Sequence, residues 1–141
     1  MRERLTLEQG RAKFALPPWT GCKSLARRML PGTLIVHDAF YWVPLIAWYA
    51  GLRRDEICGL ELADIACVDG HWQFIVQPNS VRPLKTVSSQ RIVPMASELV
   101  RLGLPAYVDA LRKEGETLLF PELRVASGKS SMGDVFYKRL D

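Results

Sequence analysis

Hydrophobic residues in the first half of the chain follow the period of a helix. Four large apolar side chains recur at intervals of three or four positions: Trp42, Leu45, Ile46 and Tyr49. This spacing places them on one face of a helix. Asp38 is suited to cap the start of that helix, and Gly51 is suited to end it. A second helix is predicted to begin near Arg53 and to run through Leu60.

The period changes to that of β-strands in the middle of the chain. Two apolar runs, 65–68 and 72–76, flank the dipeptide Asp69-Gly70. An Asp-Gly pair between two apolar runs is a strong signal for a β-hairpin. A third strand is predicted over 90–94, with Pro94 at its end or at an edge position. The pattern therefore predicts a small antiparallel sheet of about three strands.

Helical patterns return on both sides of this sheet. Near the N-terminus, Thr6 is suited to cap a short helix together with Gln9, three residues further on. After the third strand the pattern predicts two short helices, an extended apolar segment, a loop and a last helix, at 96–103, 105–111, 118–121, 125–131 and 132–140. The predicted fold class is α+β, mostly α, with helices around a small antiparallel three-stranded sheet.

Charge is distributed unevenly along the chain. Residues 1–35 carry seven basic and two acidic side chains and are interrupted by proline and glycine, which predicts a basic arm leading into a domain over 36–141. The net charge is −4 over residues 36–70 and +3 over residues 71–101. Basic ends around an acidic middle suit a polyanion such as nucleic acid. A solvated surface with ordinary variation in charge would give the same balance.

Composition and cysteine usage narrow the function classes. Apolar residues make up 48% of the chain and charged residues 24%, which excludes a largely disordered protein. The longest apolar stretch, 39–52, is too short for a membrane span, which needs about 20 residues. No membrane partner is expected. The sequence has three cysteines and no C-x-x-C pair, which is a poor disulfide framework and predicts a reduced, cytoplasmic protein. Cys58, Cys67 and His71 match no compact zinc motif, so we expect small buried thiols and no metal.

The segment 51–56, Gly-Leu-Arg-Arg-Asp-Glu, combines a turn signal with two arginines. Gly51 favours a sharp reversal that leaves Arg53 and Arg54 at the start of the next helix. Free N–H groups, the helix dipole and a guanidinium together form a phosphate site. Glu56 lies three residues after Arg53 and is expected to hold its guanidinium in place. The alternative is two solvated arginines on an exposed turn.

A second segment with candidate chemistry spans 85–94. Lys85 and Thr86 precede a polar tip, and Arg91 opens the returning strand. An exposed lysine can reach into a DNA groove and protonate the leaving oxygen of a phosphodiester held nearby. The alternative is a charged hairpin tip that keeps a sheet edge soluble.

Together, the two segments resemble the tyrosine recombinases, the phage integrase family. The run 45–65 contains Gly-Leu-Arg, a Glu three positions after the Arg, and an Asp-Ile ending, and it is similar to the first conserved box of that family. The order Lys-Thr, Ser, Arg, Val-Pro over 85–94 resembles the family's β-hairpin. Leu-Phe-Pro at 119–121 also fits the family's order of elements, so the resemblance covers roughly 36–141.

The resemblance implies an activity and a set of roles. Members of the family cut duplex DNA with a tyrosine, form a 3′-phosphotyrosyl link and pass the strand to another DNA, without a metal, nucleotide or other cofactor. Arg53 matches the first catalytic arginine, Glu56 the acidic residue that supports the site, and Lys85 the hairpin lysine that acts as general acid. DNA contacts are expected from Arg54, Thr86 and Arg91. The full-length enzyme would assemble as a tetramer on DNA, with no small-molecule substrate.

Some features of the family do not occur in this sequence. The family has a His-x-x-Arg box, but His37 and His71 are each followed at the third position by Phe. Tyr137 matches a helix before that box and is not assigned as the nucleophile. The other tyrosines are expected to pack in the core: Tyr41, Tyr49 and Tyr107. We therefore expect the N-terminal part of a catalytic domain, incomplete at the C-terminus, inactive in DNA cleavage by itself and with apolar surface left exposed.

Two other classes of function stay open. One is a non-enzymatic DNA-binding or regulatory module on the same scaffold, and the other is a helical protein-interaction domain without a DNA role. Weak duplex binding that falls steeply with salt would separate the first two classes from the third, because phosphate contacts release counterions.

Overall fold

The computed structural model of the chain describes residues 6–78 and 90–123. The helices are α1 (Leu7–Phe14), α2 (Pro17–Thr20), α3 (Ala39–Ala50), α4 (Arg54–Cys58), α5 (Ser97–Arg101) and α6 (Leu104–Lys113), with the 3₁₀ turns η1 (Leu62–Asp64) and η3 (Pro121–Leu123). The strands are β1 (Ile65–Val68), β2 (His71–Val76) and β3 (Arg91–Pro94). This arrangement confirms a mixed fold of helices around a small antiparallel three-stranded sheet.

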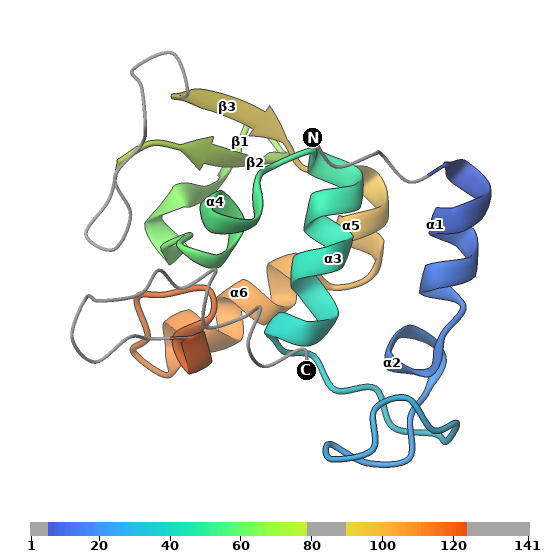
Figure 1. The fold of residues 1–141 in the computed structure, drawn as a ribbon. Helices are drawn as coiled ribbons and strands as arrows, with labels where there is room; N and C mark the ends of the chain where they lie inside the picture. The colour runs from blue at the N-terminus through green and yellow to red at the C-terminus, as the bar shows by residue number, and fades with distance from the viewer. Residues whose placement is uncertain (1–5, 79–89, 124–141) are drawn as a thin grey trace.

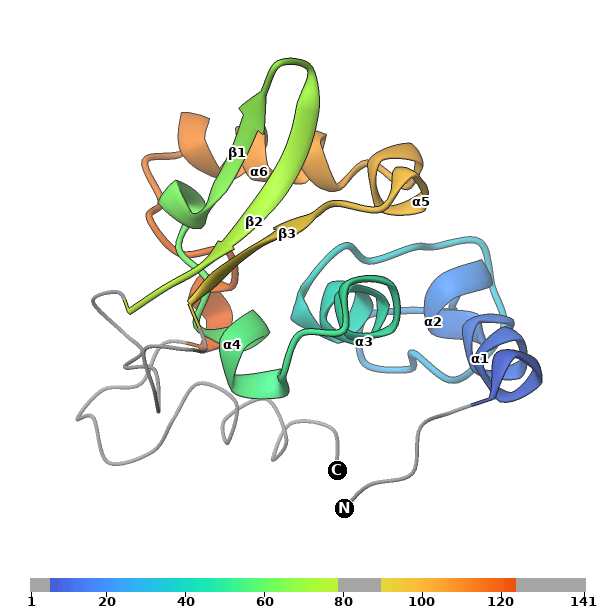
Figure 2. The same cartoon turned by 90° about the horizontal axis from the view of Figure 1, so that it is seen from above.

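Helix α3 is the central element, because the α1–α2 pair lies on one side of it and the sheet with α4, α5 and α6 lies on the other (Figures 1 and 2). The Asp38 carboxylate caps its start by accepting from the Tyr41 N–H at 3.2 Å, as the sequence predicts. Gly51 ends it in the left-handed conformation with φ 69°, which glycine adopts without strain. Trp42 and Ile46 of this helix are fully buried.

The sheet has the order β1-β2-β3, with all pairs antiparallel. Asp69 and Gly70 both have positive φ, as a two-residue hairpin of the primed type requires. Phe74 and Val76 of the middle strand are buried against the helices. Pro94 is the last residue of β3, an edge strand, in agreement with the predicted position.

The helices after the sheet follow the predicted order. Pro105 lies in the first turn of α6, where its missing N–H costs nothing. The extended apolar segment pairs with the chain after α4 through a bridge between Glu61 and Leu118, and Phe120 is fully buried. Arg112 of α6 donates to the Leu62 carbonyl at 3.0 Å and to that of Ile65 at 2.8 Å. The predicted loop 125–131 and last helix 132–140 lie outside the described residues.

Several predicted boundaries differ from the observed ones by one or two residues; the helix predicted over 96–103, for example, is α5. The helix expected through Leu60 ends at Cys58, because the chain turns at Gly59 and then pairs with the segment around Leu118. The buried Leu60 is therefore a core residue of the connection and not of the helix. The first residue of the strand expected over 90–94 lies outside β3, which begins at Arg91.

The described part of the predicted basic arm packs against α3. The Trp19 indole N–H donates to the Tyr41 carbonyl at 2.9 Å. The rings of Phe14 and Trp48 meet edge to face, with centroids 6.2 Å apart. A Cβ at Gly10 would lie 2.3 Å from the Trp48 ring, so only glycine allows α1 to approach α3 this closely. The division of the chain at residue 35 stays a prediction.

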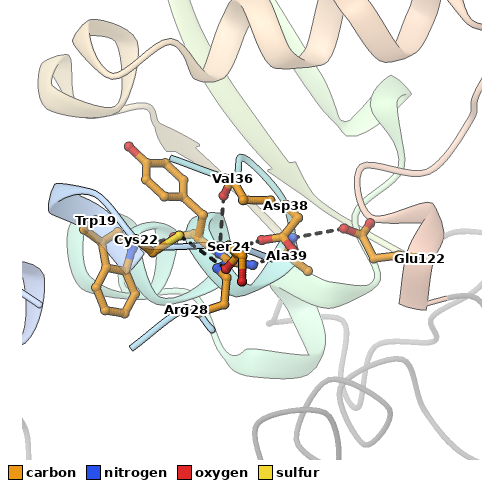
Figure 3. A network of polar contacts seen from close by, with 9 residues as sticks. Trp19, Cys22, Ser24, Arg28, Val36, Asp38, Ala39 and Glu122 are labelled. Carbon is orange, nitrogen blue, oxygen red and sulfur yellow. Dashed lines mark hydrogen bonds and ion pairs between the residues drawn. The ribbon is translucent and has the colours of Figure 1, made fainter. Parts of the chain in front are cut away.

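The start of α3 is held by a network of charged groups (Figure 3). Arg28 forms a bidentate pair with Asp38, with N–O distances of 2.9 and 3.1 Å, and its side chain is 10% exposed. The same guanidinium lies 4.7 Å from the centre of the Phe40 ring. Glu122 accepts from the Ala39 N–H at 3.0 Å. The network ties the loop before α3 and the segment after residue 120 to one helix terminus.

Asp38→Ala is expected to lower the free energy of unfolding by about 2–4 kcal/mol. The substitution removes a helix cap worth about 1 kcal/mol and leaves the Arg28 guanidinium without its carboxylate partner. Asp38→Asn keeps a capping oxygen and removes only the charge, so it should cost about half as much. Urea unfolding followed by circular dichroism measures both losses. Equal losses in the two variants would show that capping contributes nothing here.

Candidate phosphate-binding site

Arg53 stands at the start of α4, immediately after the reversal at Gly51. Its backbone is extended, with φ −73° and ψ 151°, which is the conformation of an N-cap residue. The neighbouring Leu52 is buried, so its side chain fixes the turn to the hydrophobic core. The Arg53 side chain is exposed. The reversal and the buried Leu52 therefore hold the backbone of Arg53 in place, while its side chain extends into solvent.

Glu56 is the buried charged group of the site, with 5% of its surface exposed. One of its oxygens accepts from the Arg53 backbone N–H at 2.8 Å. Both of its oxygens also accept from Arg91 on β3, in a bidentate pair with N–O distances of 3.0 Å. Such planar pairing fixes geometry as well as charge. The carboxylate thus connects the first turn of α4 to the third strand.

These contacts favour the ionised form of Glu56. Burial by itself would raise the pKa of this carboxyl, but the hydrogen bonds from Arg91 and from the Arg53 N–H outweigh burial, and the pKa lies below its ordinary value. In turn, the hydrogen bond to Glu56 raises the pKa of Arg91. The pair is therefore fully charged at neutral pH.

The sequence predicts that Glu56 holds the Arg53 guanidinium; in the structure the two charges attract each other, but the hydrogen bonds of Glu56 go to other groups. Glu56 holds Arg53 through its backbone N–H, and its side-chain partner is Arg91, 35 positions further along the chain. Within residues 6–78 and 90–123, no hydrogen bond or ion pair to the Arg53 guanidinium is present. The reason is that the Glu56 carboxylate turns toward the Arg53 backbone N–H, as the N3 residue of a capping box does, and toward Arg91 on β3.

Of the other predicted site residues, Arg54 and Arg91 lie in the described part of the chain, and Lys85 and Thr86 do not. Arg54 is half-buried in the first turn of α4, with its Nε 3.6 Å from an Asp55 oxygen. Arg91, predicted as a DNA contact, pairs with Glu56 and keeps 38% of its side chain exposed. Lys85 and Thr86 lie outside the described residues, between β2 and β3 in the sequence.

Helix α4 itself contributes little charge to the site. It has only five residues, so its dipole is small, and Asp55 and Glu56 in its first turn already oppose it. The expectation that a helix terminus supplies much of the anion attraction is therefore weakened. The positive charge that faces solvent comes mainly from the Arg53 side chain.

The remaining reactive side chains are mostly buried. Tyr41 is buried, and Tyr107 donates its hydroxyl to the Leu119 carbonyl while burial raises its pKa, as expected for core residues. Tyr49 is 40% exposed, so its predicted core position is wrong. Burial raises the pKa of Cys58 to about 12, which leaves the thiol unreactive. Cys67 is exposed, contrary to the prediction of buried thiols.

Neither a family model nor a characterised protein nor a solved structure matches this chain. In the described ranges, no group of three or more His, Cys, Asp or Glu side chains is arranged to hold a metal ion. No helix in the same part of the chain has the length and apolar character needed to cross a membrane.

Glu56→Gln is expected to lower the free energy of unfolding at pH 7 by about 1–3 kcal/mol, since one partner of the pair is buried and the other is part-exposed. The pKa of Glu56 lies below its ordinary value of 4.5, so ionised Glu56 stabilises the fold above that pH. This contribution is lost as the pH falls through the lowered pKa. The difference between variant and original chain should therefore shrink as the pH falls below 4.5 and through the lowered pKa of Glu56.

Urea unfolding at a series of pH values makes the comparison. Glu8→Gln, at an exposed position in the first turn of α1, is the matched control and should differ little from the original chain. A loss in Glu56→Gln that stays constant from neutral to acid pH would contradict the assignment of an ionised, hydrogen-bonded carboxylate.

Proposed function

We propose that Arg53 binds a phosphate of duplex DNA and that the chain is part of the catalytic domain of a tyrosine recombinase. One observation carries the proposal: the Arg53 side chain is exposed, while its backbone is held by Glu56, which in turn pairs with Arg91. A guanidinium presents paired N–H donors that match the oxygens of a phosphate. Because the backbone of Arg53 is already held in place, less conformational entropy is lost when the contact forms.

The charges around Arg53 support this assignment. Both oxygens of Glu56 accept from Arg91, and no hydrogen bond between this carboxylate and the Arg53 guanidinium is present in the described part of the chain. The three groups together carry a net positive charge. An anion approaching Arg53 therefore meets a cation that keeps its hydrogen-bond donors available among the described residues.

In a recombinase, each residue would have a distinct role. Arg53 would stabilise the charge that develops on the non-bridging phosphate oxygens during strand cleavage. Glu56 and Arg91 would position it, and Lys85 would protonate the departing 5′-oxygen. Arg54 and Thr86 would contact the DNA backbone. The proposal extends to assembly as a tetramer on DNA and to a cytoplasmic location, and it assigns no strand cleavage to this chain alone.

A second candidate is a DNA-binding module without catalysis. It needs no nucleophile, and the described tyrosines agree with that: burial raises the pKa of the Tyr41 and Tyr107 phenols, which neither candidate uses for cleavage. Both candidates share the phosphate contact at Arg53. An experiment on DNA binding therefore tests what they have in common.

Arg53→Gln should weaken binding to a duplex of random sequence about three- to tenfold at low salt. It should also reduce the slope of log affinity against log salt concentration by about 1, because one phosphate contact is lost. Fluorescence anisotropy with a labelled duplex at several salt concentrations measures both quantities. Arg101→Gln is the matched control, because it removes the same charge from an exposed arginine of α5 that is paired with Glu98.

The outcome of the two variants separates a specific contact from general attraction. If Arg53→Gln and Arg101→Gln weaken DNA binding equally, the affinity depends on the net charge of the chain alone. That result would contradict a phosphate site at Arg53. Absence of duplex binding by the original chain at low salt would contradict both candidate functions and would favour a protein-interaction domain.

A further inference from the structure

In Figure 2, α1 lies on the side of α3 away from the sheet. Residues of these two helices and of the turn after α3 line a groove. Its volume is about 540 Å³. Its lining consists of two residues from α1 and five from α3 and the turn after it: Lys13, Phe14, Pro44, Ala47, Trp48, Gly51 and Leu52. The volume falls within the range of small-molecule sites, which is about 300–1,000 Å³.

The groove exists because of particular residues in the two helices. Gly10 lets the backbone of α1 come against the Trp48 ring. The small side chain of Ala47 is exposed and leaves space between the larger neighbours. The edge-to-face contact of Phe14 with Trp48 forms an aromatic wall. Rigid apolar walls of this kind are typical of sites for apolar ligands.

Lys13 is the one charged residue among those that line the groove. Its side chain is half-buried, and burial lowers the pKa of its amine. In the described part of the chain, the amine has no ion pair or hydrogen bond and lies 6.0 Å from the centre of the Phe14 ring. An anion in the groove would supply the partner that the amine lacks and would offset the cost of its burial.

We propose that this groove binds a small organic anion, with an aromatic or branched apolar body of one or two rings and a carboxylate that pairs with Lys13. The apolar walls from Phe14 and Trp48 set the character of the body, and the charge of Lys13 sets that of the head group. The bound anion would contact α1 and α3 together, so it would also stabilise the packing of α1 on the rest of the chain. Arg53 is not among the residues that line the groove, although Leu52, its neighbour in the chain, is one of them.

Calorimetric titration with 2-naphthoate tests the proposal, with 2-naphthylmethanol as the uncharged probe of the same shape. The original chain should bind the carboxylate about five- to tenfold more tightly than the alcohol, because only the carboxylate forms a charge-assisted hydrogen bond. Lys13→Met should remove this preference. Lys113→Met, at an exposed position of α6, removes the same charge elsewhere and should leave both affinities unchanged.

Ala47→Phe tests the position of the apolar body. Because Ala47 is exposed, a larger side chain fills the groove without entering the core, and circular dichroism should show an intact fold. Binding of 2-naphthoate should then fall at least tenfold. Unchanged affinity in Ala47→Phe, or equal weakening by Lys13→Met and Lys113→Met, would overturn the proposal.

The same variants distinguish other occupants of the groove. Self-association that Ala47→Phe abolishes, with no 2-naphthoate binding by the original chain, would assign the groove to a second copy and overturn the proposal. Weaker duplex binding in Lys13→Met than in Lys113→Met, again without 2-naphthoate binding, would make Lys13 a DNA contact instead.

Discussion

The ion pair between Glu56 and Arg91 is the interaction on which the candidate site depends. Helix α4 has five residues, too few to be stable without tertiary contacts. Its inner face is held by the buried Ile57 and Cys58, and its first turn is held by the carboxylate that binds Arg91 of β3. The pair sets the distance between a short helix and an edge strand. The pair thereby fixes the backbone of Arg53, because the Arg53 N–H donates to the same carboxylate.

A second constraint is the central position of α3. Its start is fixed by Asp38 and Glu122, and its end is fixed by Gly51. One side of this helix supports the core against the sheet and α6, and the opposite side receives α1 through Trp48. The reversal after α3 then leads directly into Arg53. The groove beside Lys13 is lined in part by Gly51 and Leu52 of this reversal, so α3 and the turn after it support both the groove and the proposed phosphate contact.

Local features of the fold were predictable because each depends on residues near in sequence. The capping of α1 by Thr6, the end of α3 at Gly51 and the hairpin at Asp69-Gly70 are all set by side chains within four positions of one another. The partner of Glu56 could not be read in this way, since Arg91 is 35 positions away. Alternation along β3 was an available signal, because it places Arg91 on the same face as the part-buried Val93. The groove beside Lys13 was not predictable, because it depends on how α1 docks on α3.

A double-mutant cycle on the two residues of the ion pair tests the central claim most directly. The free energy of unfolding is measured for the original chain, for Glu56→Gln, for Arg91→Gln and for the double variant. If the pair holds α4 against β3, the double variant loses little more than either single variant, with a coupling energy of about 1–3 kcal/mol. If the loss in the double variant equals the sum of the two single losses to within about 0.5 kcal/mol, the two residues act independently. That result would contradict the claim that this pair fixes the backbone of Arg53.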